Sequence, residues 1–352
     1  MAINSTKIAK LAGVSRSTVS KVINNYPDIP QSTKDKVMAI INENNYKPNI
    51  YAQVLKGIAP KVICIYIHVS YKDAMKEFNS HYMMTMLSNF VYEAEQIGYS
   101  ISVEMVRANE DQKKSLEKIT NTFLEKRIES AVFIGQTSDD TYIDELVKRG
   151  FKLASIDRSV DVGGNSFNVI TDDADGAYRA TELLYKNGYK NIMHIGGDLK
   201  KLSSRSRVKG YEKSVTKHGG QIIKLNGTYT AEFGQECADI FCKEYLDKVD
   251  SIVFGNDTIA TGFIIRMMQL DPQVLNKIGY IGFDDDVIDT LFTPTISSMV
   301  VDFKGITKAT LQALTANSED KDQEIPHEIH SKMLLIERDS SSKRWKIECL
   351  RA

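Results

Sequence analysis

Apolar positions follow two different patterns along this chain, and the change falls near residue 60. Before it, apolar residues recur three and four positions apart, which is typical of one face of a helix. This spacing predicts short helices over residues 5–12, 16–24 and 31–44. Asn4 and Ser15 can cap the first two helices, and Gly13 permits the left-handed turn between them. The pattern therefore predicts an all-α helix-turn-helix bundle.

The second predicted helix, in the segment AGVSRSTVSKVINN, consists mostly of weak helix formers. Val19, Val22 and Ile23 are expected to hold it in the bundle, as Val37, Ile40 and Ile41 hold the third helix. Its outward face carries short polar or cationic side chains, namely Arg16, Ser17, Ser20 and Lys21. Such side chains suit close contact with a polyanion, and the second helix of this motif enters the DNA major groove.

A short helix is predicted over residues 50–56. Pro48 ends the third helix, Asn49 is a good N-cap, and Gly57 closes the segment. Two helical turns are unstable alone in water, and the apolar Leu55 needs a partner. DNA in a dimeric complex would supply both the stabilisation of this helix and a partner for Leu55.

Beyond residue 60, apolar runs such as KVICIYIHV (61–69) alternate with amphipathic stretches. Runs of this kind are typical of parallel strands buried on both faces. One series ends at residue 157, and a second is expected to begin at NVITDD (168–173). The prediction is an α/β body of two doubly wound parallel-sheet lobes. Because ligands bind at the carboxyl ends of such strands, the informative polar residues are those that end strands: Asp157, Arg158, Asn256, Asp257 and Asp284.

The near-neutral net charge hides an asymmetry. Residues 1–60 hold eight Lys or Arg against three Asp or Glu, whereas the remainder holds 37 against 43. A basic segment on an acidic body indicates a polyanion-binding module joined to a part with another task. The four cysteines are scattered without zinc-ligand spacing and predict reduced thiols. With neither a signal peptide nor a spanning run, the protein is expected to be soluble and cytoplasmic, without membrane contact.

The sequence favours no enzyme. IGGD (195–198) lacks the spacing of a phosphate loop, and His194 fits a core position better than a catalytic one. No catalytic residue, metal site or cofactor is therefore predicted.

The segment KIAKLAGVSRSTVSKVINN, followed by YKPNIYAQVLKG, resembles the lactose-repressor (LacI/GalR) family of bacterial transcriptional regulators, densely over residues 4–57. The resemblance implies that Arg16, Ser17 and Lys21 read bases. It gives mainly phosphate-contacting or positioning roles to Ser15, Thr18, Ser20 and Asn24. It places Asn49 and Ala52 of the hinge helix on the minor groove, with Leu55 as a wedge that kinks the DNA. Pro30 departs from the family's usual Ser or Thr cap.

The body resembles the family's effector domain, which is periplasmic-binding-protein-like. Its landmarks are IDR at 156–158, RVKGY at 207–211, FGNDTIATG at 254–262 and IGFDD at 281–285. The resemblance implies an effector site of Tyr82, Asp157, Arg207, Tyr229, Asn256 and Asp284, with Phe78 and His81 near its mouth. The family usually has Pro-Phe-Phe where this chain has SHYMM, so the first-lobe contacts are less well defined.

Together these features predict a helix-turn-helix DNA-binding domain (1–48), a hinge helix and linker (49–60), a two-lobed effector-binding and dimerisation domain (61–340) and a tail (341–352). The implied protein is a homodimeric, allosteric repressor of a carbohydrate-utilisation operon that binds a pseudo-palindromic double-stranded operator and a sugar-like effector. A purine-like or sugar-phosphate corepressor, or a protein partner, are the alternatives. Whether the effector is an inducer or a corepressor stays open. A transport binding protein and an enzyme are rivals from other classes.

Overall fold

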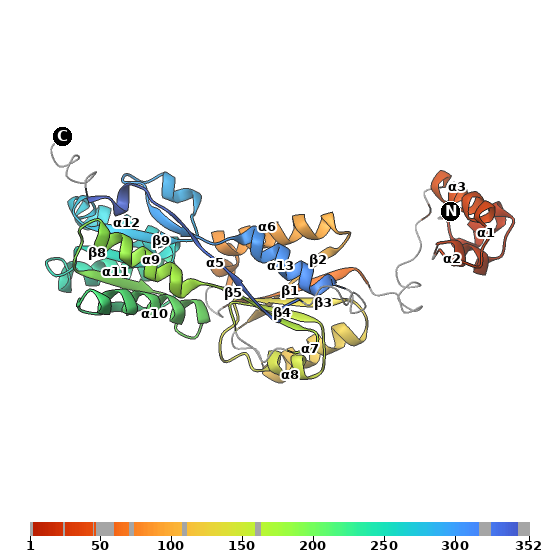
Figure 1. The fold of residues 1–352 in the computed structure, drawn as a ribbon, viewed down its shortest axis with the longest axis horizontal. Coiled ribbons are helices and arrows are strands. Elements are labelled where there is room, and N and C mark those ends of the chain that lie inside the picture. The colour runs from red at the N-terminus through yellow and green to blue at the C-terminus, as the bar shows by residue number, and fades with distance from the viewer. Residues whose placement is uncertain are drawn as a thin grey trace. The chain divides into compact units, whose positions relative to one another are not determined.

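The computed structural model describes residues 3–23, 25–44, 46, 60–69, 74–107, 111–158, 163–316 and 325–343. The chain divides into two units, Met1–Pro60 and Lys61–Ala352, and each is described by itself. The helices described in the first unit are α1 (Ser5–Ala12), α2 (Arg16–Ile23) and α3 (Gln31–Glu43) (Figure 1). They match the three predicted helices to within a residue at each described end. The predicted hinge helix lies outside the described residues.

Local hydrogen bonds explain where these helices begin and end. Asn4 Oδ1 accepts the Lys7 amide at 2.9 Å, and Ser15 Oγ accepts the Thr18 amide at 3.0 Å. Gly13 adopts φ +64°, the left-handed conformation that glycine reaches without strain. The third helix begins after Pro30 without a side-chain cap. The sequence thus specifies the turn of the helix-turn-helix through short-range contacts.

Apolar side chains from all three helices form the core of this unit. Its buried members include Ile8, Val19, Val22, Val37 and Ile41. Ile23 and Ile40 pack against this cluster but stay partly exposed, so the prediction that both are buried is only partly correct. The small core leaves the outer face of α2 to polar side chains.

The second unit contains two six-stranded sheets, one in each lobe, which confirms the predicted fold class of two parallel-sheet lobes. The first has the order β11-β5-β4-β3-β1-β2, and all its strand pairs are parallel. Helices α6 and α13 cover one face and α7 and α8 the other (Figure 1). The elements of this lobe are β1 (Val62–Val69), α5 (Ala74–Phe78), α6 (His81–Gln96), β2 (Ser100–Arg107), α7 (Gln112–Leu124), β3 (Ser130–Ile134), α8 (Tyr142–Lys148), β4 (Leu153–Ile156), β5 (Ser166–Thr171), α13 (Phe303–Thr315) and β11 (Glu328–Ser331).

The second sheet has the order β12-β10-β9-β8-β6-β7, in which only β12 runs antiparallel to its neighbour among the described strands. Helices α9 and α10 pack together, as do α11 and α12. The elements of this lobe are α9 (Asp173–Lys186), β6 (Ile192–Gly196), α10 (Leu202–Lys217), β7 (Ile223–Asn226), α11 (Ala231–Glu244), β8 (Ser251–Phe254), α12 (Asp257–Leu270), β9 (Gly279–Phe283), β10 (Ser297–Val300) and β12 (Leu334–Ile336), with 3₁₀ turns at Pro272–Asn276, Val287–Thr290 and Asp339–Ser341.

The chain crosses between the lobes at positions that the sequence pattern does not predict. The strand in NVITDD was predicted to open the second lobe, but β5 pairs with β4 and β11 in the first sheet. The chain then returns to the first lobe for α13 and β11, whose places the alternating pattern did not predict. The lobes are therefore joined at three crossovers, near residues 172, 302 and 332.

Helices α11 and α12 approach so closely that glycine is required between them. A Cβ atom on Gly262 would lie 2.0 Å from the Ala231 carbonyl oxygen. We expect Gly262→Ala to lower the free energy of unfolding by about 1–3 kcal/mol, because the helices must separate. Thermal denaturation measures this loss. Gly163→Ala, where nothing lies within 4 Å, is the control, and equal melting temperatures for the two variants would contradict the close packing.

Candidate functional site

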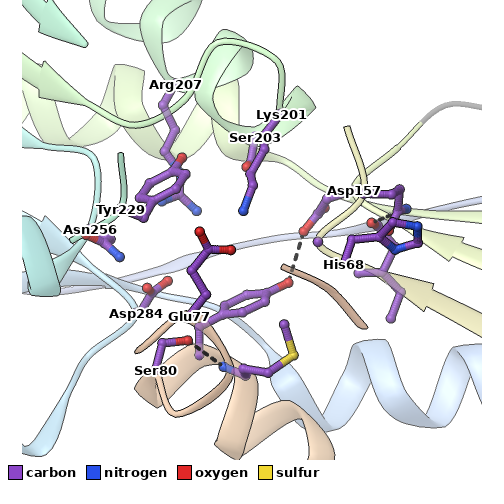
Figure 2. Close-up of a pocket in the computed structure, with 15 residues that line it drawn as sticks. His68, Glu77, Ser80, Asp157, Lys201, Ser203, Arg207, Tyr229, Asn256 and Asp284 are labelled. Atoms are coloured by element: carbon purple, nitrogen blue, oxygen red, sulfur yellow. Dashed lines mark hydrogen bonds between the residues drawn. The ribbon is translucent and has the colours of Figure 1, made fainter. Parts of the chain in front are cut away.

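A pocket opens where the strand order of each sheet reverses. In the first sheet this point lies between β1 and β3, and in the second between β6 and β8. Loops that leave neighbouring strands in opposite directions open a crevice there. The cavity encloses about 780 Å³, including its solvent-open part. Its lining comes from both lobes and comprises His68, Glu77, Ser80, Tyr82, Met83, Gly135, Gln136, Ile156, Asp157, Lys201, Ser203, Arg207, Tyr229, Asn256 and Asp284 (Figure 2).

All six predicted effector residues line this one pocket, namely Tyr82, Asp157, Arg207, Tyr229, Asn256 and Asp284. The other two polar residues that end strands, Arg158 and Asp257, do not line the pocket. Arg158 is buried against Asp144, with 3.0 Å between Nη2 and Oδ2. Asp257 accepts the Ser298 hydroxyl and the Asp286 amide. Phe78 and His81, expected at the mouth, are not lining residues, whereas their neighbours Glu77 and Ser80 are.

Two aspartates project into the pocket from residues in unusual backbone conformations. Asp157 follows β4 with φ +54°, and Asp284 follows β9 with φ +100°. Asp157 Oδ1 accepts the Thr171 amide at 2.8 Å, and its Oδ2 accepts the Tyr82 hydroxyl at 3.2 Å. Asp284 is 7% exposed, and its Oδ1 has no hydrogen-bond partner among the described residues. Strained residues of this kind concentrate at functional sites.

Arg207 is held from several sides rather than facing a ligand alone. Its Nε donates to Asp173 Oδ1 at 2.7 Å, and its Nη1 donates to the Gly255 carbonyl. Its guanidinium carbon lies 4.3 Å from the centroid of the Phe283 ring. Arg207 and Asp173 are 5% and 2% exposed, so the pair is buried. Asp173, the first residue of α9, was not predicted as part of the site.

Buried negative charge dominates the electrostatics of this pocket. Burial raises the pKa of Asp173 to about 6, although Arg207 lowers it. Burial also raises the pKa of Asp284 to about 6 against the lowering effects of Arg207 and His81. The pKa of Asp157 is raised for the same reason. Burial therefore disfavours the ionised form of all three carboxyls.

The second lobe also contributes an amide and an aromatic ring. Asn256 Oδ1 accepts the Ile259 amide at 3.0 Å at the start of α12, which leaves the amide nitrogen as the group that can donate to a ligand. The Tyr229 hydroxyl lies 2.7 Å from Ser204 Oγ. Lys201 Nζ lies 5.7 Å from the Tyr229 ring centroid. The pocket thus combines acceptors, donors and a ring face, as sites for polar organic ligands do.

Sequence reasoning missed several lining residues of the first lobe. Gln136 lies two residues beyond the end of β3, so the strand-end rule could have found it. Its Nε2 donates to Ser155 Oγ at 2.6 Å and to the Ile156 carbonyl at 2.9 Å. His68 Nε2 lies 2.6 Å from the Tyr142 hydroxyl, and burial lowers its pKa to about 4. Glu77 points from α5 into the pocket (Figure 2), and no sequence signal marked it.

Contacts between the lobes lie beside the pocket. Lys200 Nζ lies 2.7 Å from Asp139 Oδ2, and the Ser138 amide donates to the Lys200 carbonyl at 3.1 Å. Lys76 of α5 pairs with Glu232 of α11. The two lobes are therefore tied to each other on the described chain.

The predicted DNA-binding residues of α2 lie together on its outer face. Ser15, Arg16 and Ser17 are exposed, whereas Thr18, Ser20 and Lys21 are partly exposed. Arg16 Nε donates to Ser5 Oγ at 3.0 Å, and Ser15 Oγ lies 2.7 Å from Ser17 Oγ. Asn24, Asn49, Ala52 and Leu55 lie outside the described residues. In the described part of the chain no His, Cys, Asp and Glu group could hold a metal ion, and no described helix is long and apolar enough to cross a membrane.

Lys21, the cation at the end of this face, forms an ion pair with Asp28. Lys21 Nζ donates to Asp28 Oδ2 at 2.5 Å, and this bond lowers the pKa of Asp28. We expect Asp28→Asn to tighten DNA binding by about two- to tenfold, because it releases Lys21 and removes an anion that phosphates would meet. Fluorescence anisotropy with operator DNA measures the change. Asp35→Asn, the same substitution on α3, is the control; equal affinities for the two variants would contradict the role given to Asp28.

Both units contain a segment that matches a known protein family. Residues 6–49 match the family described as bacterial regulatory proteins, lacI family, and residues 181–341 match the periplasmic binding protein-like domain. Catabolite control protein A of Priestia megaterium is 27% identical over 92% of this chain and 96% of its own length. The transcriptional regulator MalR of Clostridium butyricum is 27% identical over 96% and 99%. The repressor PurR of Aliivibrio fischeri is 26% identical over 90% and 92%.

Solved structures share the fold. A lac repressor dimer bound to operator and the anti-inducer ONPF has a TM-score of 0.80 at 22% identity, covering 97% of this chain and 100% of that one. A complex of the transcriptional regulator CelR with cellobiose has a TM-score of 0.67 at 18% identity, covering 96% and 100%. At these identities the likeness establishes the fold alone.

Proposed function

The chain belongs to the lacI family of bacterial regulatory proteins, and we propose that it is a homodimeric repressor of carbohydrate-use genes, controlled by a small sugar-like effector. Two headpieces bind a pseudo-palindromic operator, and each places α2 in the major groove. Arg16, Ser17 and Lys21 read bases, while Ser15, Thr18, Ser20 and Asn24 contact phosphates or position the helix. The hinge residues Asn49, Ala52 and Leu55 contact the minor groove. Because its target is genomic DNA, the protein acts in the cytoplasm.

One observation carries the effector part of this proposal. Asp157 of the first lobe and Arg207, Asn256 and Asp284 of the second line the same pocket. Carboxylates, an amide and a guanidinium around a tyrosine ring offer the bonds that a hydroxyl-rich ring needs. A ligand in this pocket touches both lobes, so its affinity depends on how the lobes are arranged.

That dependence gives the control mechanism. A ligand shifts the equilibrium between two lobe arrangements only by the difference in its affinity for them. The arrangement sets the relative positions of the two chain segments that enter the DNA. An effector that favours the DNA-binding arrangement is a corepressor, and one that favours the other is an inducer.

A purine-like corepressor is the second candidate. The lining offers two tyrosine rings, Tyr82 and Tyr229, on which a base could stack. Relatives of this chain include PurR repressors of Aliivibrio fischeri and Vibrio vulnificus. Sugar phosphates and a protein partner are further alternatives for the same regulator.

Operator binding in rising salt tests the proposal. Full-length protein is titrated into labelled genomic fragments from upstream of its own gene at increasing salt. We expect a specific complex whose association constant falls by about 10³-fold or more between 50 and 200 mM salt, as phosphate contacts require. The absence of a specific complex at low salt would overturn the DNA-binding function.

A further inference from the structure

The pocket has more buried negative charge than its own cations neutralise. Asp173 and Asp284 are buried and Asp157 is partly buried beside them, whereas Arg207 is the buried cation that faces them among the described residues. One guanidinium cannot neutralise three carboxylates. A buried carboxylate without a counterion is costly, because the interior solvates charge poorly.

The contacts of the two lining cations, Arg207 and Lys201, show which carboxylate lacks a counterion. Arg207 is engaged by Asp173 and the Gly255 carbonyl. Lys201, the other cation of the lining, lies over the Tyr229 ring. Asp284 lines the pocket, and its buried Oδ1 has no hydrogen-bond partner among the described residues. The negative site is therefore centred on Asp284.

A second orphaned acceptor lies across the pocket. Gln136 is 3% exposed, and its Oε1 has no hydrogen-bond partner in the described chain. The orientation of its amide is fixed, because the Ile156 carbonyl requires the donor Nε2. The unsatisfied buried groups of the two walls thus include acceptors on both sides, which call for a ligand rich in donors.

The chemical classes of ligand differ in how they meet these groups. A phosphate brings only acceptors and more negative charge. A hydroxyl satisfies one hydrogen bond of Asp284 but leaves its charge. An ammonium group supplies up to three donors and the missing positive charge, and charge-assisted hydrogen bonds are stronger than neutral ones. The hydroxyls of the same molecule can meet Gln136 and Asn256.

We propose that the effector is an amino-bearing polyol, such as an amino sugar, whose ammonium group pairs with Asp284. This inference rests on the proposed function, because it gives the chemical class of the ligand in the effector pocket. The charged or titratable groups that face Asp284 include Arg207 of α10, His81 and Tyr82 of α6, Asp173 of α9, Asp257 of α12 and Asp286 of the following loop. Of these, Arg207 is engaged by Asp173, and His81 Nδ1 lies 3.8 Å from Asp286 Oδ1.

Matched sugars test this proposal on the full-length protein at pH 7.5. Glucosamine, galactosamine and mannosamine are compared with glucose, galactose and mannose, and with the 6-phosphates of those hexoses, first by thermal shift and then by calorimetry. We expect at least one amino sugar to bind tenfold or more tightly than its parent hexose, and no phosphate to bind better than its parent. In Asp284→Asn the ratio should fall to about one, whereas Glu117→Gln, an exposed charge on α7, should preserve it.

The free protein provides a second readout. Asp284→Asn should raise the melting temperature at pH 8 by about 2 °C or more, because it removes an uncompensated buried charge. A lower melting temperature for this variant, parent hexoses that match the amines in every pair, or no response to any of the nine sugars would each overturn the inference. Operator binding by the same preparation decides the proposed function separately.

Discussion

Replacing Arg207 by methionine is expected to lower the free energy of unfolding of the two-lobed unit by about 3–5 kcal/mol at pH 8. Methionine keeps the apolar stem against Phe283 but leaves Asp173 buried without its ion partner. Removal of one member of a buried pair is costly, because the remaining charge has neither water nor a counterion. Urea denaturation of the full chain, followed by circular dichroism, measures the loss.

The same loss should depend on pH. The pKa values of Asp173 and Asp284 are raised in the folded protein to about 6, so the folded state binds these protons more tightly than the unfolded chain. Their cost to stability is present above about pH 6 and disappears as the pH falls and the carboxyls are protonated. We therefore expect the destabilisation by Arg207→Met to be smaller at pH 5 than at pH 8.

Lys209→Met provides the control on the same helix. Lys209 is exposed, and its replacement should change the free energy of unfolding by no more than about 0.5 kcal/mol. If the two variants unfold at the same urea concentration at pH 8, the ion pair of Arg207 with Asp173 does not support the pocket as described.

Arg16→Ala is expected to weaken operator binding by about 5- to 150-fold, which corresponds to the 1–3 kcal/mol of a good base contact. Arg16 is exposed on α2 and donates a hydrogen bond to Ser5 Oγ at the surface of the headpiece, so its loss should leave the fold intact. Fluorescence anisotropy with the operator and with a scrambled duplex separates specific from non-specific binding. The effect should be confined to the operator, because the scrambled duplex is bound through phosphates.

Arg127→Ala removes an equal charge from an exposed site in the body, where the side chain pairs with Glu125. It should leave both affinities unchanged. If Arg16→Ala weakens both duplexes equally, Arg16 contacts phosphates and does not read bases.

The headpiece could be predicted in detail because short-range chemistry determines it. The caps Asn4 and Ser15 and the left-handed Gly13 act within four residues of their partners, so their sequence signals are local. Ile40 was expected to be buried but is only partly so, because the extent of burial depends on how the three small helices cross. The angle at which the helices cross cannot be predicted from local sequence signals.

In the body, the strands could be predicted but their distribution between the two sheets could not. The strand β5 was assigned to the wrong lobe, because an apolar run does not show which of two sheets its strand joins. Of the five polar residues that end strands, Asp157, Asn256 and Asp284 line the pocket, since carboxyl ends meet at one edge of a sheet. Asp173 was missed because its partner Arg207 lies 34 residues away, and only the packing of α9 on α10 brings the two together.

Operator affinity measured with and without a ligand that occupies the pocket tests the central claim most directly. Full-length protein is titrated with operator DNA in the presence of the sugar that gives the largest thermal shift, in parallel with Asn256→Ala and the control Glu117→Gln. We predict that the ligand changes the operator dissociation constant of the wild type and of Glu117→Gln by tenfold or more, within the usual range of allosteric coupling, and that Asn256→Ala loses most of this response. An operator affinity that stays the same while the ligand demonstrably binds would contradict control of DNA binding through this pocket.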